Sequence, residues 1–251
     1  MHNQKFVTVL LCSLTSSSAM ADWFGGAEAG WTSDTNFTGA PAGAAKVEES
    51  IASYSLYVGH FMPLANKRSA FIVKADAAAA RLDKFDVLDN ESYGGSFGLF
   101  HGFSRMQSLS ATVGGSARRY EDSQRDTESY YAQLGFKQKL SESFWLREGL
   151  VYDTGAAKVA SAEYVGYGVN GSVNWAPFKS TLLTLGGGWN EREYEVAVAN
   201  ERTSASASLG VVQQLGKVIY VRAGATAQEH KTNAGSAYDT VLYSVGLGLS
   251  L

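Results

Sequence analysis

The last eleven residues, 241–251, show the clearest alternation of apolar and small side chains in the chain. One parity is wholly apolar, with Val241, Tyr243, Val245, Leu247, Leu249 and Leu251. The other parity is mostly small, with Leu242, Ser244, Gly246, Gly248 and Ser250. Because successive side chains of a strand point to opposite faces, the stretch predicts a strand with one apolar face and one face of mostly small residues.

Similar alternation recurs throughout the chain after residue 21. It marks candidate strands near residues 27–32, 53–59, 71–79, 92–99, 109–116, 130–137, 165–175, 183–190, 204–211 and 219–226. A weaker segment at 143–156 brings the expected number to about twelve. An even number of strands is typical of bacterial single-chain β-barrels.

Turn and loop signals alternate between these segments. Tight turns are expected around Pro63, Ser104, Ser141, Pro177 and Gly216. Longer polar loops are expected at residues 33–47, 83–91, 119–128, 154–162, 191–203 and 228–238. Short turns at one end and longer loops at the other match the periplasmic and extracellular rims of an outer-membrane barrel. The predicted fold is therefore all-β, a transmembrane antiparallel up-and-down β-barrel with both termini on the periplasmic side.

The final strand also resembles a known targeting signal. Ser244, Gly246, Leu249 and Leu251 follow the order polar-x-Gly-x-x-apolar-x-apolar. This order is similar to the C-terminal strand that Gram-negative outer-membrane β-barrels present to their insertion machinery. Leu251 departs from the pattern, because bacterial members more often end in Phe or Trp. The resemblance implies that the barrel insertion machinery, outer-membrane lipid and lipopolysaccharide are the chain's partners.

Residues 1–21 predict a secretory signal peptide. Lys5 precedes an apolar run and a Ser-rich stretch, and residues 19–21 supply the small-x-small order for cleavage before Asp22. A lipoprotein signal is excluded because the bulky Leu11 precedes Cys12, where a small residue is required. Cys12 is the only cysteine, so residues 22–251, the predicted barrel domain, contain no disulfide and no Cys-ligated metal.

Composition agrees with many strands and narrows the function classes. The chain has 27 Gly, only 3 Pro and 12% aromatic residues, a combination that favours strands and tight turns over helices or disorder. No stretch after residue 21 approaches the ~20 continuous apolar residues of a membrane helix. A formal net charge of −3 gives no electrostatic reason to expect nucleic acid as a partner.

The aromatic residues fall into two groups along the predicted strands. Those flanking the short turns are Phe61, Phe103, Phe144 or Trp145, Trp175 and Phe178. Those toward the loops are Trp31, Tyr93, Tyr130, Tyr164, Trp189 and Tyr238. Amphipathic rings favour the lipid headgroup level, so two bands are expected in a barrel. The alternative is a soluble β-sandwich, but its exposed strand faces usually carry Lys, Glu and Thr, whereas these carry Ser, Gly, Asn and Gln.

The seventh segment is the weak point of the barrel interpretation. Arg147 and Glu148 are adjacent, so a flat strand would send one charge into lipid. At the bilayer midplane a basic residue costs ~2–4 kcal/mol and an acidic one less. We therefore expect Arg147 to face the lumen, with a bulge or a shallow depth relieving Glu148.

Candidate chemistry is sparse. Outer-membrane lipid hydrolases place a His with a Ser near the outer leaflet, so that the His can accept the nucleophile's proton. His60 and His101 precede turns at the opposite rim, and no neighbouring residues of His230 mark a nucleophile. The carboxylates of residues 83–91 lack the Gly arrangement of a calcium loop. No enzyme, metal site or cofactor is predicted, and the mixed-charge runs at 118–126 and 191–195 are interpreted as hydrated loops.

The predicted lumen carries charges of both signs. The charged residues on the inward-facing parity of the predicted strands are Glu28, Lys74, Asp76, Lys137, Arg147 and Arg222. If the last strand closes on the first, Arg222 and Glu28 lie two strands apart, roughly 10 Å at ~4.8 Å per strand. Gly246 and Gly248 between them leave room for the two side chains to meet. These charges either satisfy one another in a filled interior or select ions and solutes in a pore.

About twelve strands enclose a narrow lumen. The architecture resembles narrow porins for acidic sugars and the YaiO-like barrels related to exopolysaccharide secretion proteins, which would add periplasmic secretion components as partners. Because the lumen charges are mixed, the sequence favours a narrow channel or export pore for small polar solutes or polysaccharide. The alternatives are a non-conducting structural, adhesion or assembly barrel and an outer-membrane lipid hydrolase.

Overall fold

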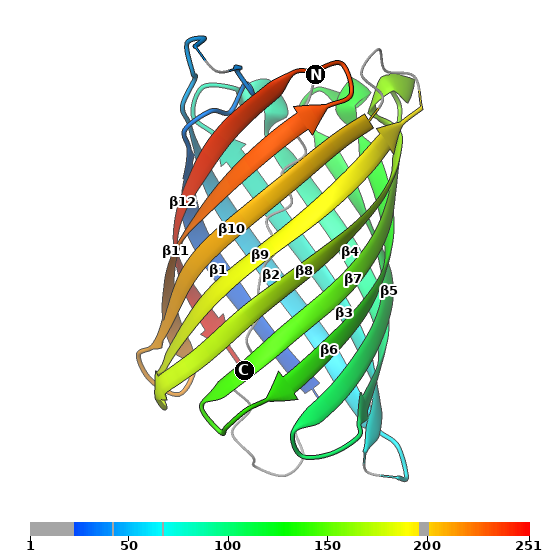
Figure 1. Ribbon diagram of the computed structural model, residues 1–251, viewed down its shortest axis with the longest axis vertical. Coiled ribbons are helices and arrows are strands. Elements are labelled where there is room, and N and C mark those ends of the chain that lie inside the picture. Colours follow the sequence, from blue (N-terminus) through cyan, green and yellow to red (C-terminus); the bar gives the residue numbers. More distant parts are fainter. Residues whose placement is uncertain (1–22, 42, 67, 196–200) are drawn as a thin grey trace.

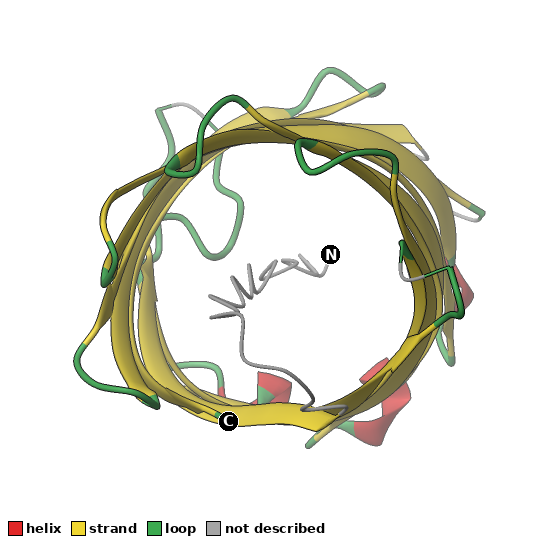
Figure 2. Cartoon of the chain, turned by 90° about the horizontal axis from the view of Figure 1, so that it is seen from below, coloured by secondary structure: helices red, strands yellow, loops and turns green. Residues whose placement is uncertain are grey.

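The computed structural model describes residues 23–41, 43–66, 68–195 and 201–251, so the predicted signal peptide and its cleavage site lie outside the described residues. Twelve strands within this part of the chain form one closed antiparallel barrel, and each strand pairs with its neighbours in sequence (Figures 1 and 2). The strands are β1 (Trp23–Asp34), β2 (Glu49–Pro63), β3 (Ser69–Leu82), β4 (Asn90–Gly102), β5 (Gln107–Tyr120), β6 (Thr127–Lys139), β7 (Phe144–Ala157), β8 (Tyr164–Phe178), β9 (Thr181–Tyr194), β10 (Glu201–Gln214), β11 (Ile219–Thr232) and β12 (Ala237–Ser250).

The barrel closes between the first and the last strand. β12 pairs with β1 from Gly26 opposite Ser250 to Asp34 opposite Leu242. This closure removes the unpaired strand edges that would be costly in lipid. The predicted all-β up-and-down barrel of about twelve strands is confirmed.

The outer face is apolar and the inner face is mostly small and polar. Leu56, Leu185, Leu209 and Leu247 point outward and are each more than half exposed. Among the described residues, the buried hydrophobic side chains are only Ala70, Trp145, Tyr164 and Leu182. An apolar belt outside and almost no apolar core inside is the arrangement expected of a barrel surrounded by lipid.

Three short 3-10 turns occur in the loops, η1 (Asp86–Leu88), η2 (Ser123–Arg125) and η3 (Ala160–Ala162). None of the helices in the described part of the chain is long and apolar enough to cross a membrane.

The short turns gather at one end of the barrel, the lower end in Figure 1, which we call the turn end. They cover residues 64–68, 103–106, 140–143, 179–180 and 215–218. The prediction of a turn around Pro177 is wrong in position, because β8 continues to Phe178. A break in register between Trp175 and Phe178 accommodates Pro177, since proline has no N–H to donate to the ladder and is tolerated at bulges.

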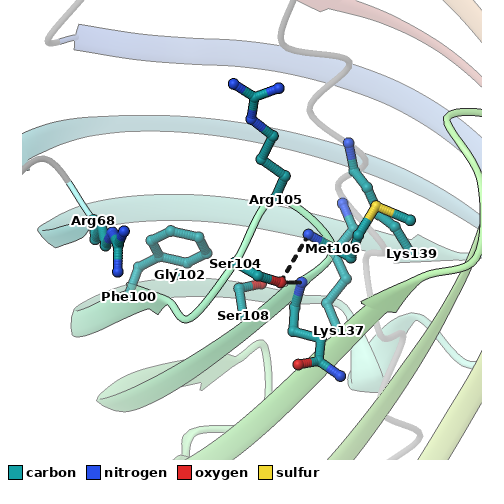
Figure 3. A pocket seen from close by; sticks show the side chains of 10 residues that line it. Arg68, Phe100, Gly102, Ser104, Arg105, Met106, Ser108, Lys137 and Lys139 are labelled. Atoms are coloured by element: carbon teal, nitrogen blue, oxygen red, sulfur yellow. Dashed lines mark hydrogen bonds between the residues drawn. The ribbon is translucent and has the colours of Figure 1, made fainter.

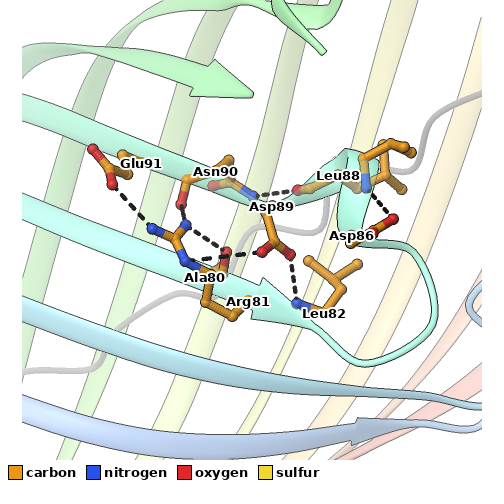
Figure 4. Close-up of polar contacts among 9 residues, drawn as sticks. Ala80, Arg81, Leu82, Asp86, Leu88, Asp89, Asn90 and Glu91 are labelled. Carbon is orange, nitrogen blue, oxygen red and sulfur yellow. Dashed lines mark hydrogen bonds and ion pairs between the residues drawn. The ribbon is translucent and has the colours of Figure 1, made fainter. Parts of the chain in front are cut away.

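The opposite end, the loop end, has shorter loops than the sequence predicts. Residues 154–162 and 228–238 were expected to be loops, yet β7 continues to Ala157 and β11 to Thr232. Polar strand ends stay paired because their side chains bridge neighbouring strands. In Figure 4, Arg81 on β3 lies 3.0 Å from the Glu91 carboxylate on β4, and Asp89 accepts a hydrogen bond of 2.8 Å from the Leu82 N–H. Such cross-strand pairs stabilise a ladder that has already left the apolar belt.

The weak seventh segment forms the regular strand β7. Its pairing with β6 and β8 runs without a break, so the bulge considered for Glu148 is absent from this strand. Glu148 is exposed on the outer face, close to the start of β7, with Gly171 beside it on β8. The other expectation for Glu148, a shallow depth in the bilayer that would lower the cost of its charge, stays a prediction.

Candidate functional site

The inner wall of the barrel is the candidate functional site, and it is lined largely by small residues. On β10 the inward positions include Ser204, Ser206, Ser208 and Gly210, and on β12 they include Ser244, Gly246 and Gly248. Ser244 and Gly246, proposed as part of the targeting strand, therefore face the lumen, whereas Leu249 faces outward and Leu251 follows the end of β12. Side chains this small project only a short way into the lumen.

Inward aromatic rings lie against glycines on the neighbouring strand. A Cβ atom on each of these glycines would meet the ring of its partner. The pairs are Phe24 with Gly59, Tyr57 with Gly26, Tyr131 with Gly114, Tyr164 with Gly155, and Tyr220 with Gly248. Because glycine has no side chain, each ring can lie close to the backbone wall instead of projecting across the lumen.

Two of the predicted lumen charges meet across β12. Arg222 Nη2 on β11 lies 2.5 Å from Glu28 Oε1 on β1. Tyr220 donates a hydrogen bond of 2.9 Å to the other carboxylate oxygen. A Cβ on Gly246 would approach both Arg222 and Glu28 to 3.1 Å. The small residues of β12 are therefore what allows side chains two strands apart to pair.

Lys74 and Asp76 form a second pair on β3. Their side chains lie 3.1 Å apart and retain 31% and 40% of their exposure to solvent. Lys74 Nζ is also 5.7 Å from the centre of the Tyr57 ring. Both side chains lie on the inward parity of β3, so water reaches the interior of the barrel at this height.

Lys137 and Arg147 lie on another part of the wall. They face each other directly in the register of β6 and β7, and Lys137 Nζ is 5.0 Å from the centre of the Trp145 ring. β7 is six strands from β1 around the ring. The structure therefore divides the predicted lumen residues into two neutralised pairs near the seam and one basic group across the barrel.

The sequence interpretation missed a cluster toward the loop end. Arg192 Nη2 lies 2.7 Å from Asp153 Oδ2, and both side chains are about 10% exposed. The Arg192 guanidinium also lies 4.3 Å from the centre of the Tyr164 ring. Residues 191–195 were interpreted as a hydrated loop, but β9 continues to Tyr194. The available signal was parity, because Arg192 continues the inward series of Gly186 and Gly188.

Two buried carboxylates at the loop end were also missed. Asp34 and Glu49 are fully buried. Asp34 accepts hydrogen bonds from the backbone of Asn36 and from the Thr240 hydroxyl. Glu49 accepts hydrogen bonds from the backbone N–H groups of residues 83 and 84. These carboxylates hold loops in place, because each replaces the water that the loop amides would otherwise bind.

The histidines have structural neighbours. His60 packs against Trp23 on the outer face, with ring centres 4.6 Å apart, and His101 Nδ1 lies 2.8 Å from the Ser69 hydroxyl. The Ser204 hydroxyl lies 2.6 Å from His230 Nδ1, a neighbour that sequence proximity did not reveal. Ser204 and His230 are direct cross-strand partners, so the register alone accounts for their contact.

Metal ligands do not gather in the described part of the chain. It contains no group of three or more His, Cys, Asp or Glu side chains placed to hold a metal ion. The acidic residues at 83–91 instead form hydrogen bonds and ion pairs with nearby groups. Asp86 accepts a hydrogen bond from the Val87 N–H, and Asp89 pairs with Arg81.

A closed antiparallel barrel with an apolar outer belt and a polar, charged lumen defines the class of outer-membrane β-barrel proteins. The chain belongs to the family described as "Protein of unknown function (DUF2860)", whose model matches residues 104–229. A comparison with curated proteins finds no match.

Solved structures with the same fold include outer-membrane channels. The COG4313 outer membrane channel from Pseudomonas putida F1 has a TM-score of 0.72 at 12% identity, covering 91% of this chain and 95% of that one. The outer membrane channel DcaP of Acinetobacter baumannii has a TM-score of 0.54 at 10% identity, covering 91% and 96%. The KdgM porin in complex with disordered oligogalacturonate has a TM-score of 0.50 at 10% identity, covering 90% and 99%.

Proposed function

We propose that this protein is a narrow outer-membrane channel for small polar solutes. The observation that carries the proposal is the exposure of inward charges. Lys74, Asp76 and Arg222 point into the lumen and keep 31%, 40% and 23% of their side-chain exposure. A filled interior would bury such groups, whereas charges that keep water are what a conducting lumen requires.

The wall supports the same function. Rings that lie against glycines occupy the periphery of the barrel and leave its centre to water and solute. Ser, Thr and Asn side chains provide hydrogen-bonding groups, and Gly adds no bulk, which suits a polar passenger better than an apolar one. The solved structures of the same fold that are described as outer membrane channels agree with this proposal.

Polysaccharide is a more specific candidate for the solute that passes through the channel. The KdgM porin, which shares the barrel fold, was solved in complex with disordered oligogalacturonate. The lumen here has hydroxyl and amide groups that can bind sugar hydroxyls, but its charges are partly neutralised in pairs. We therefore propose small polar solutes as the general class of passenger, with short saccharides as one member.

Single-channel conductance in a planar bilayer tests the proposal. The protein, purified from outer membranes of cells that express the full chain, is expected to give steady conductance. Lys74→Glu should shift ion selectivity toward cations, because it replaces a solvent-exposed lumen cation with an anion. Lys231→Glu makes the same charge change on the outer face of β11 and should leave selectivity unchanged.

A stable barrel that conducts nothing would contradict the channel and favour a non-conducting structural barrel. Equal selectivity shifts from Lys74→Glu and Lys231→Glu would show that Lys74 does not lie in the conducting path.

A further inference from the structure

The turn end of the lumen contains a cavity with an unusual charge. Its volume is about 460 Å³, and its lining comes from the turns after β2 and β4 and from the adjoining ends of β4, β5 and β6 (Figure 3). Four lining residues are basic, namely Arg68, Arg105, Lys137 and Lys139, and none is acidic. Like charges brought together in one concavity repel one another and attract anions.

Hydrogen bonds hold the backbone beside two of these cations, Arg68 and Arg105. The Gly102 N–H donates to the Arg68 carbonyl at 2.7 Å, which ties the first turn to β4. The Ser104 hydroxyl accepts hydrogen bonds of 3.1 Å from the N–H groups of Met106 and Gln107, which shapes the second turn beside Arg105. The backbone at Arg68 and beside Arg105 is therefore tied to its neighbours.

Counter-charge is scarce around three of these cations, Arg68, Arg105 and Lys139. Lys139 Nζ lies 3.7 Å from a carboxylate oxygen of Glu142, but that side chain is 93% exposed. An exposed pair at this distance is weak and screened by salt. Among the described residues, Arg68 and Arg105 form no ion pair.

A fifth cation lies next to the cavity, outside its lining. Arg147 stands directly opposite Lys137 in the register of β6 and β7. Its Nε is buried and has no hydrogen-bond partner among the described residues. Arg147 therefore adds positive charge beside the cavity, which strengthens the attraction of this part of the wall for anions.

We propose that this cavity is a binding site for small, multiply charged oxyanions, such as phosphates or polycarboxylates. Guanidinium groups bind such oxygens in a fork, and ammonium groups add mobile point charges. In the channel proposed above, this site would act as a selectivity filter, so that role rests on the proposed function. Anion binding itself can be measured without conduction. If the turn end faces the periplasm, as short turns do in bacterial barrels, the channel would favour anionic passengers at that mouth.

The test is a ³¹P NMR titration of inorganic phosphate with the whole protein in a sugar-based detergent. A saturable change in the phosphate signal is expected. Lys137→Gln with Lys139→Gln should weaken the apparent affinity by roughly fivefold, as expected for the loss of two solvent-accessible charge contacts. Arg105→Gln, a change in an exposed turn, should weaken it less and cannot disturb the strands.

The matched control is Lys179→Gln with Lys217→Gln, which removes two positive charges from the same end of the barrel outside the cavity. This control should bind phosphate like the unmodified chain. If both double variants weakened phosphate binding equally, the effect would come from net charge alone and the proposed binding site would be wrong. A titration that does not saturate would also overturn the site. A chain that binds phosphate but conducts nothing would retain the site and refute only the proposed channel.

Discussion

At the scale of single residues, the positions of the glycines determine how the inward side chains pack against the lumen wall. Gly248 lies directly opposite Tyr220 in register, and the ring occupies the space that a side chain would fill. From this position the Tyr220 hydroxyl reaches Glu28, which also binds Arg222. One missing side chain therefore permits a ring, a carboxylate and a guanidinium to pack flat against the wall.

Gly248→Ala is predicted to displace the Tyr220 ring from the wall. The added methyl group would clash with the ring, so the hydrogen bond to Glu28 should be lost and the barrel destabilised by about 1–3 kcal/mol. Single-channel conductance should fall as the ring moves into the lumen, and urea unfolding followed by tryptophan fluorescence gives the stability.

Gly210→Ala is the control, because a Cβ there would meet nothing closer than 3.9 Å. Equal losses of conductance and stability from both substitutions would mean that the ring position does not depend on Gly248.

At the scale of elements, the loop end joins segments that are far apart in sequence. The loop before β8 and the loop after β9 meet where the Glu195 N–H donates a backbone hydrogen bond of 3.2 Å to the Glu163 carbonyl. The hydrogen bond between the two carboxyl groups raises the pKa of Glu195 above its usual range. Elsewhere, hydrogen bonds from the Tyr120 N–H and the Lys158 ammonium lower the pKa of Asp126.

Opposite pH dependence is predicted for these two contacts. A raised carboxyl pKa means that the Glu163–Glu195 contact is present at low pH and is lost as the pH rises through the pKa of Glu195. The lowered pKa of Asp126 means that its contacts are present at neutral pH and are lost only on acidification below the usual range. Side-chain ¹³C NMR titration measures both midpoints.

Glu163→Gln should lower the midpoint of Glu195, because an amide can donate to the ionised carboxylate, and should leave that of Asp126 unchanged. An unchanged Glu195 midpoint in this variant would show that Glu163 is not its partner.

The elements also show how far the sequence can be interpreted. Period-2 alternation predicted the strands and placed Lys74, Arg147 and Arg222 on the inner parity, because a strand has only two faces. It did not predict that β9 continues through Arg192, because a run of charges looks the same in a loop and in a ladder above the lipid. Nor could parity show that Arg147 and Lys137 stand opposite each other, since register between strands depends on pairing across the sheet.

At the scale of the whole molecule, the seam between β1 and β12 determines whether the barrel is closed. Ala29 and Leu247 face each other across it. Directly opposed residues of antiparallel strands have Cα atoms about 4.5–5.5 Å apart, which is within the range that a disulfide can bridge. The seam can therefore be tested chemically.

Cysteines at positions 29 and 247, in a chain that also carries Cys12→Ala, are predicted to form a disulfide on mild oxidation. The product should migrate differently from the reduced chain after boiling without reductant, because its ends are joined. Ala29→Cys with Ala223→Cys is the control, since Ala223 lies on β11, beyond β12. Equal cross-linking of the two pairs would contradict the register of the seam.

The closed seam also has a consequence for how the chain reaches its folded state. Gly26 is paired with Ser250, so the contact that completes the barrel joins the two most distant parts of the described sequence. Contacts of such large sequence separation form slowly, because the loop they close carries a large entropic cost. Until β12 is in place, β1 presents an open edge with unsatisfied backbone groups. A product that lacks its last strand would therefore be an adhesive, aggregation-prone sheet and not a smaller barrel.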